Sequence, residues 1–279
     1  MGAVFGPAGN SDSYKNRKDV SVFDYLKSFG LNAYEYQCGR GVRISSKTAE
    51  EFGMSMKGIN LSIHAPYYIS LSSVEEEKRE NSVKYILQTA KIAKCMGANR
   101  VVVHSGSCGK IDRQLALKLA KETMSKAILA LKEENLGDVS ICPETMGKVN
   151  QLGTLDEVLS FCEVSSNMIP CIDFGHLNAR TFGKTNSSDA YAKILDSIEN
   201  KLGYDRLKVF HSHFSKIEYT IPGGEKKHLT FEDTKYGPDF EPLAELIAKR
   251  GLSPIFICES SGTQAEDAQK MQEMYRKFL

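Results

Sequence analysis

Short β-rich runs alternate with longer amphipathic stretches along this 279-residue chain, and this alternation constrains the fold more than any other feature. The runs begin near Val4 and then lie at Ala33–Tyr36, Leu61–His64, Arg100–His104, Val139–Pro143, Ile169–Asp173, Lys208–His213 and Ile255–Glu259. Strict alternation of strand and helix favours a parallel sheet with right-handed crossovers. Eight such units favour closure of that sheet, so we expect an α/β fold that forms a single (β/α)8 barrel.

The stretches between the runs predict helices, most clearly over Val74–Met96 and Arg113–Glu134, where apolar residues recur at helical spacing. The longest irregular stretch, Ser215–Asp239, predicts a large loop after the seventh strand. An open, doubly wound sheet is the structural alternative, but no glycine-rich phosphate fingerprint supports it. Because the sequence contains no evident linker or repeat, we expect one domain over residues 1–279.

Composition excludes some functions and locations. Apolar residues make up 41% and charged residues 25% of the chain, which is the balance of a globular protein with a full core. The formal net charge of +1 gives no support for bulk attraction to nucleic acid, although a local basic groove remains compatible with it. The seven cysteines have no CxxC spacing, and no secretory signal or membrane-length apolar run accompanies them. We therefore expect a cytoplasmic, soluble protein with no membrane partner.

Histidines and acids gather where the predicted strands end. Six of the eight strand ends carry or are followed by such residues, which are His64, His104, Glu144, Asp173, His176, His211, His213 and Glu259. The sixth histidine, His228, lies in the predicted loop after the seventh strand. In a closed barrel these side chains converge on the face formed by the carboxyl ends of the strands, where the active sites of this fold lie.

This residue set is typical of a metal site. Neutral imidazole and carboxylate are the ligands that zinc, manganese and iron share, so the sequence does not distinguish among these ions. Burial of Glu144, Asp173 and Glu259 at one barrel mouth without a cation would place three like charges together. A bound divalent metal ion removes that conflict.

The ordered series of motifs resembles the endonuclease IV family of apurinic/apyrimidinic endonucleases, which belongs to the xylose isomerase-like TIM barrel superfamily. The motifs are His64–Tyr67, Val102–Ser107, Pro143–Thr145, Cys171–His176, His211–Lys216 and Glu259–Ser260. Each motif alone is weak, but their order from about residue 60 to 260 is specific. The resemblance implies a zinc hydrolase that cleaves DNA 5′ to abasic sites by means of a metal-bridged hydroxide.

The resemblance also implies roles for individual residues. The first of up to three Zn²⁺ ions is assigned to His64, His104 and Glu144. The second is assigned to Glu144, Asp173, His211 and Glu259, and the third to His176 and His228. Glu144 then bridges two ions, and Glu259 orients the hydroxide; Mn²⁺ or Fe²⁺ is compatible with some of the sites.

Two positions depart from the family pattern. The third metal of the family takes an Asp-x-His pair, but here Lys226 occupies the aspartate position before His228. Either Glu225, one residue earlier, supplies the missing carboxylate, or the third site is weakened or absent. His213 stands where the family has asparagine, and we expect it to form a hydrogen bond behind the ligands.

Contacts with DNA are assigned to residues that follow the strands. Tyr67 resembles the tyrosine that approaches the abasic gap in the family, and no tryptophan is present to do so. The candidate phosphate contacts are Arg40, Arg43, Lys47, Lys110, Lys216, Lys226 and Lys227. The resemblance further suggests a monomer, and we expect no nucleotide cofactor.

Two other functions compete with this interpretation. The first is a single-metal sugar isomerase or epimerase of the same superfamily, with manganese or magnesium held by Glu144, Asp173, His211 and Glu259. Such a site does not require His64, His104 or His228, and these histidines favour the nuclease. The second is a barrel without activity that binds a sugar or a nucleic acid.

Overall fold

The computed structural model describes residues 2–15, 17 and 19–279 of the chain and confirms the barrel. Within these residues, eight strands form one sheet in the order β1-β10-β7-β6-β5-β4-β3-β2, and every hydrogen-bonded pair is parallel. The strands are β1 Val4–Pro7, β2 Ala33–Gln37, β3 Asn60–His64, β4 Arg100–His104, β5 Ser140–Glu144, β6 Cys171–Asp173, β7 His211–Phe214 and β10 Ile255–Cys258.

The two edge strands of this sheet, β1 and β2, meet and nearly close the barrel. A parallel bridge joins Ala8 to Glu35, and the amide of Gly9 donates to the carbonyl of Glu35 at 2.9 Å. Gly6 permits this approach, because a Cβ atom there would lie 1.8 Å from the carbonyl oxygen of Ala33. The lack of a side chain at one position therefore decides how closely the first two strands pack.

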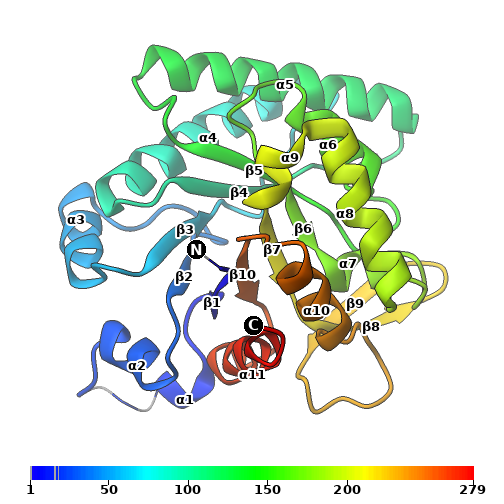
Figure 1. The fold of residues 1–279 in the computed structure, drawn as a ribbon. Helices are drawn as coiled ribbons and strands as arrows, with labels where there is room; N and C mark the ends of the chain where they lie inside the picture. Colours follow the sequence, from blue (N-terminus) through cyan, green and yellow to red (C-terminus); the bar gives the residue numbers. More distant parts are fainter. Residues whose placement is uncertain (1, 16, 18) are drawn as a thin grey trace.

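Helices surround the strands on the outside (Figure 1). They are α1 Asp12–Lys15, α2 Val22–Ser28, α3 Ser46–Ser55, α4 Glu76–Met96, α5 Arg113–Glu133, α6 Leu155–Cys162, α7 Phe174–Arg180, α8 Ser188–Leu202, α9 Tyr204–Lys208, α10 Glu241–Lys249 and α11 Gln264–Arg276. The two helices predicted most clearly are confirmed as α4 and α5. Gly97 ends α4 in the left-handed conformation (φ 75°), and the Asp112 carboxylate caps the first amides of α5.

The core lies between the strands and the helix layer. Phe256 of β10 is fully buried, stacks on Phe5 with ring centroids 5.5 Å apart, and meets the ring of Phe240 at 5.1 Å. These rings fill the space behind β1 and β10, so the outward faces of the strands are apolar. None of the helices in the described residues is both long and apolar enough to span a membrane.

The region around the seventh strand differs from the sequence prediction. Lys208 belongs to helix α9, and the strand begins only at His211. The predicted loop Ser215–Asp239 contains an antiparallel hairpin of β8 Lys216–Thr220 and β9 Gly224–Leu229. β8 alternates polar and apolar residues over only five positions, and three consecutive charged residues in β9 conceal the alternation of its partner.

Candidate metal centre

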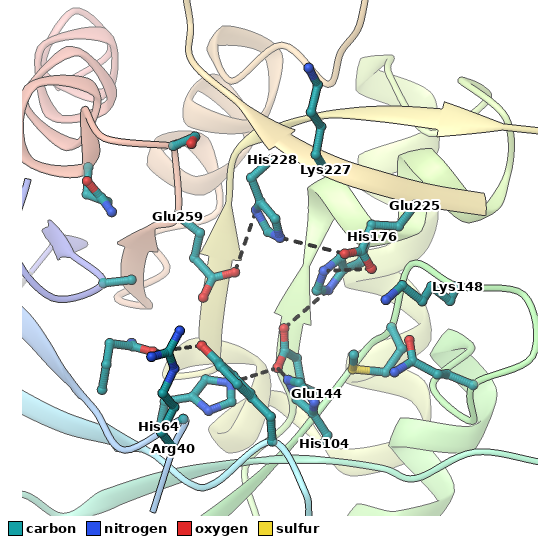
Figure 2. Close-up of a pocket in the computed structure, with 18 of the residues that line it drawn as sticks. Arg40, His64, His104, Glu144, Lys148, His176, Glu225, Lys227, His228 and Glu259 are labelled. Carbon is teal, nitrogen blue, oxygen red and sulfur yellow. Dashed lines mark hydrogen bonds and ion pairs between the residues drawn. The ribbon is translucent and has the colours of Figure 1, made fainter. Parts of the chain in front are cut away.

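Three neighbouring strands bring His64, His104 and Glu144 together at the carboxyl end of the barrel. The Oε2 atom of Glu144 lies 3.3 Å from Nε2 of His64 and 3.3 Å from Nε2 of His104. Nδ1 of His64 donates to the carbonyl of Ala65 at 2.8 Å, which leaves the Nε2 lone pair directed at this group. The three side chains line a cleft of about 1130 Å³ (Figure 2).

A second group of donors shares Glu144 with the first. Ligand atoms of Glu144, Asp173, His213 and Glu259 lie within 4.8 Å of one another. Nδ1 of His213 is 3.2 Å from Oε1 of Glu144 and 3.5 Å from Oε1 of Glu259. Glu144 therefore presents one oxygen to each group, as a carboxylate that bridges two metal ions does.

A third group lies between helix α7 and the hairpin, where His176 faces Glu225 and His228 (Figure 2). Nε2 of His176 is 3.4 Å from Oε2 of Glu225, and Nε2 of His228 is 3.9 Å from Oε1 of Glu225. Nδ1 of His176 donates to the carbonyl of Thr145 at 2.9 Å, so its Nε2 atom is again free to act as a ligand. The Ser215 hydroxyl forms a hydrogen bond with Nδ1 of His228 at 2.8 Å.

A β-bulge in the hairpin explains how residues three apart reach the same group. In a regular strand, residues 225 and 228 would point to opposite faces. Here the register shifts between Glu218 and Tyr219, and Lys226 is the extra residue without a partner across the hairpin. Glu225 and His228 thus share the inner face, while Nζ of Lys226 lies 2.6 Å from Glu218.

The buried charged groups at the centre stabilise one another electrostatically. Burial favours a higher pKa for Glu144, but the charge of His213 and hydrogen bonds from His104, His176 and His213 keep this pKa well below its usual range. Asp173 has less compensation, and burial raises its pKa to about 6. Protein groups therefore do not fully compensate the negative charge of the Asp173 carboxylate, and a bound cation would do so.

The donor set fits divalent metal ions. Oδ2 of Asp173 is buried and has no hydrogen-bond partner among the described residues. Ligand atoms about 2.0–2.1 Å from a tetrahedral Zn²⁺ ion lie roughly 3.3 Å from one another. The separations of 3.2 to 3.5 Å within the first two groups agree with that spacing. A mixture of imidazole and carboxylate suits zinc, manganese or iron.

The placement of His211 differs from the expectation. His211 and His213 both point into the barrel, because side chains two residues apart share one face of a strand. The strand begins at His211, so this ring lies deeper, and its Nε2 is 3.0 Å from Oε2 of Glu35. Burial lowers the pKa of His211 to about 4. His213 takes the place in the second group that the sequence assigned to His211.

The rim of the cleft carries an exposed tyrosine and basic side chains. Tyr67 is 54% exposed and stacks on the His104 ring with centroids 5.3 Å apart. The basic residues that line the cleft are Arg40, Arg43, Lys148, Lys226 and Lys227. Lys148 was not predicted, since it follows β5 in a loop without a recognisable motif.

Three of the predicted phosphate contacts lie elsewhere. Lys47 and Lys110 do not line the cleft in the described part of the chain. Nζ of Lys216 donates to the carbonyl of Asp233 at 2.6 Å beneath the loop that follows the hairpin, and Lys216 is likewise absent from the cleft. A position after a strand places a residue at the right end of the barrel but does not fix its direction.

Comparison with known proteins identifies a family. A family model described as xylose isomerase-like TIM barrel matches residues 23–278. An uncharacterized protein of Methanocaldococcus jannaschii is 35% identical over 257 residues, which cover 92% of this chain and 91% of that protein. A probable endonuclease 4 of Mycoplasma pneumoniae is 29% identical over 214 residues, 75% of this chain and 69% of that protein. The solved structure of a D-tagatose 3-epimerase-like protein has a TM-score of 0.72 and 20% identity, with 92% of each chain covered, which shows the fold.

Proposed function

Because the chain belongs to the xylose isomerase-like TIM barrel family, we propose that it is a metal-dependent phosphodiesterase of the endonuclease IV type that cleaves DNA 5′ to abasic sites. The observation that carries the proposal is the position of Glu144, whose two oxygens face different groups of donors. A third group on the hairpin adds a further site next to them. The similarity to a probable endonuclease 4 supports the same function.

Each of the three groups at the cleft would hold one ion. The proposed ligands are His64, His104 and Glu144, then Glu144, Asp173, His213 and Glu259, then His176, Glu225 and His228. Bound Zn²⁺, or Mn²⁺ or Fe²⁺ at some of the sites, supplies an activated water and neutralises charge on the phosphoryl group. Glu144 fixes the spacing of two sites, and Glu259 lies beside His213, where it can orient the attacking water.

The rim supplies groups suited to DNA that lacks a base. Tyr67 projects from the first donor group and presents an exposed ring, which can fill the space left by a missing base. Arg40, Lys148 and Lys227 line the same cleft and can contact phosphates (Figure 2). These local positive charges can attract DNA although the net charge of the whole chain is only +1.

A second candidate function is supported by one specific observation. The group of Glu144, Asp173, His213 and Glu259 is by itself a complete four-ligand site. A single manganese or magnesium ion there, with two carboxylates to move a proton next to a carbonyl, would suit a sugar isomerase or epimerase. In that case His64, His104 and His228 would contact the sugar.

Cleavage of a defined duplex distinguishes the two functions. The substrate is a duplex with one tetrahydrofuran residue, and the undamaged duplex is the control. We expect Zn²⁺-dependent cleavage, and a loss of about 100-fold or more in Glu225→Ala, because the removal of a ligand weakens the third site. Glu241→Ala removes an exposed carboxylate that pairs with Lys277 and does not line the cleft in the described residues, and it leaves cleavage unchanged. Absence of cleavage together with Mn²⁺-dependent epimerisation of a ketose would reject the nuclease.

A further inference from the structure

Glu35 of β2 is a fully buried carboxylate in the barrel interior, beneath the metal centre. Its Oε2 atom accepts hydrogen bonds from the Ser62 hydroxyl at 2.9 Å and from Nε2 of His211 at 3.0 Å. Its Oε1 atom accepts from the Gln37 amide at 3.1 Å and lies 2.9 Å from Nε2 of His213. These neighbouring donors compensate the charge of the buried Glu35 carboxylate without a metal ion, so Glu35 is not expected to be a metal ligand.

His213 connects Glu35 to the cleft through its two ring nitrogens. Nε2 lies 2.9 Å from Oε1 of Glu35 and has no partner in hydrogen-bond geometry among the described residues, while Nδ1 faces Glu144 and Glu259 of the second donor group. A carboxylate oxygen this close to Nε2 favours a hydrogen over a lone pair on that nitrogen, which keeps the lone pair of Nδ1 for a metal ion. The position of Glu35 therefore selects the tautomer in which Nδ1 of His213 is the ligand atom.

The tautomer of His211, which lies deeper in the barrel than His213, is also fixed by its neighbours. Arg100 has no acceptor, and its guanidinium lies 3.5 Å from Nδ1 of His211 and donates to the carbonyl of Val209 at 2.8 Å. Nδ1 of His211 must then accept, which leaves the hydrogen on Nε2, directed at Glu35. An obligate donor at the amino end of the barrel thus fixes the proton position of His211 and makes Glu35 an acceptor.

We propose that Glu35, held by Arg100 through His211, is a positioning residue that presents Nδ1 of His213 to the metal ion bound with Glu144, Asp173 and Glu259. This inference rests on the proposed metal centre and names the residue behind one of its ligands. Cys171, His211 and His213 also lie close together. A metal ion among them is disfavoured, because Glu35 and Arg100 already engage the histidine nitrogens and bring a guanidinium charge.

The test measures zinc affinity by competition with a chelator, using Zn²⁺ as the probe, in the full-length chain. In Glu35→Gln we expect one ion to be bound about 10–100-fold more weakly, with the remaining ions unaffected. Ser212→Ala is the control, because it removes another buried hydroxyl from β7, one that donates to the carbonyl of Ile172 and does not contact Glu35. Ser62→Ala removes one donor from Glu35, and we expect a smaller loss at the same ion.

A double mutant separates positioning from a merely structural role. If Glu35 acts through His213, Glu35→Gln has no further effect on zinc binding in a His213→Ala chain. An effect of the same size in both backgrounds would overturn the inference, as would unchanged zinc affinity in folded Glu35→Gln. If Glu35→Gln does not fold, Ser62→Ala decides: equality with Ser212→Ala rejects the inference. A wild-type chain that binds no ion at this group would reject the proposed function as well.

Discussion

Arg180 holds the loop between β5 and α6, and its replacement tests how this loop supports the third donor group. The guanidinium of Arg180 donates to four carbonyl groups of the loop, those of Met146 at 2.7 Å, Lys148 at 2.9 Å, Val149 at 2.9 Å and Gln151 at 2.8 Å. The carbonyl of Gly147 in turn accepts from the amide of Glu225 at 3.1 Å. A Cβ atom on Gly147 would lie 2.6 Å from Glu225, so loop and hairpin are in close contact.

The magnitude follows from the exposure of these bonds. A buried hydrogen bond to a charged group contributes about 1.5–3 kcal/mol. The bonds to Lys148 and Val149 are exposed and contribute little, whereas those to Met146 and Gln151 are partly buried. Arg113 still donates to the Gln151 carbonyl at 2.9 Å, so the main loss is the bond to Met146, and we expect Arg180→Met to lower the free energy of unfolding by about 2 kcal/mol.

Urea denaturation measures this loss, and chelator competition measures zinc binding at His176, Glu225 and His228, which we expect to weaken in the same variant. Arg250→Met is the matched control, because the ion pair of Arg250 with Asp196 at 2.7 Å is exposed and contributes less than about 1 kcal/mol. A decrease of less than about 1 kcal/mol in the unfolding free energy of Arg180→Met would refute the claim that Arg180 holds the loop between β5 and α6. Lower stability with unchanged zinc binding would refute the link from the loop to Glu225.

Three further predictions concern the barrel. Gly6→Ala places a methyl group 1.8 Å from the carbonyl oxygen of Ala33, so we expect a low yield of soluble protein. In the control Gly137→Ala the nearest contact is 3.6 Å away and the yield should be normal, so equal yields of the two variants would contradict the argument. Phe256→Ala removes a fully buried ring, and urea denaturation should show a loss of about 3–5 kcal/mol; a change below about 1 kcal/mol would show that the core collapses around it. Burial favours a higher pKa for Glu157, but Arg113 and the amides of Gly153 and Thr154 hold this pKa below its usual value. Because the pKa is lowered in the folded state, Glu157 stabilises the protein above about pH 4, and this stabilisation is lost as the pH falls through the folded-state pKa. The difference in unfolding free energy between wild type and Glu157→Gln should therefore shrink in acid. A difference that stays constant with pH would contradict this.

The strand ends could be predicted from the sequence because a polar residue after an apolar run is a local signal. His104 follows three consecutive valines, and Glu144 follows a similar run. The exact start of β7 had no such signal, since the apolar residues Leu207, Val209 and Phe210 suit both a helix end and a strand. The start of the strand decides which histidine joins Glu144, Asp173 and Glu259, so the sequence favoured His211 where the structure brings His213.

Glu35 was missed because its local pattern indicates the opposite burial. In the run from Ala33 to Gln37, tyrosines alternate with a glutamate, which is typical of a strand with its acid in solvent. In the barrel the tyrosines face the helices and Glu35 faces the interior. Only the convergence of β2 with β3 and β7 supplies its partners, and no single segment contains that information. The bulge at Lys226 is a similar case, because it depends on pairing across the hairpin.

The number and kind of metal ions bound to each purified chain, measured by plasma mass spectrometry without added metal, tests the central claim most directly. The three donor groups at the cleft predict one ion each, mainly zinc, and one ion fewer in Glu225→Ala. A single ion per chain, mainly manganese or magnesium and retained in Glu225→Ala, would contradict the multinuclear centre.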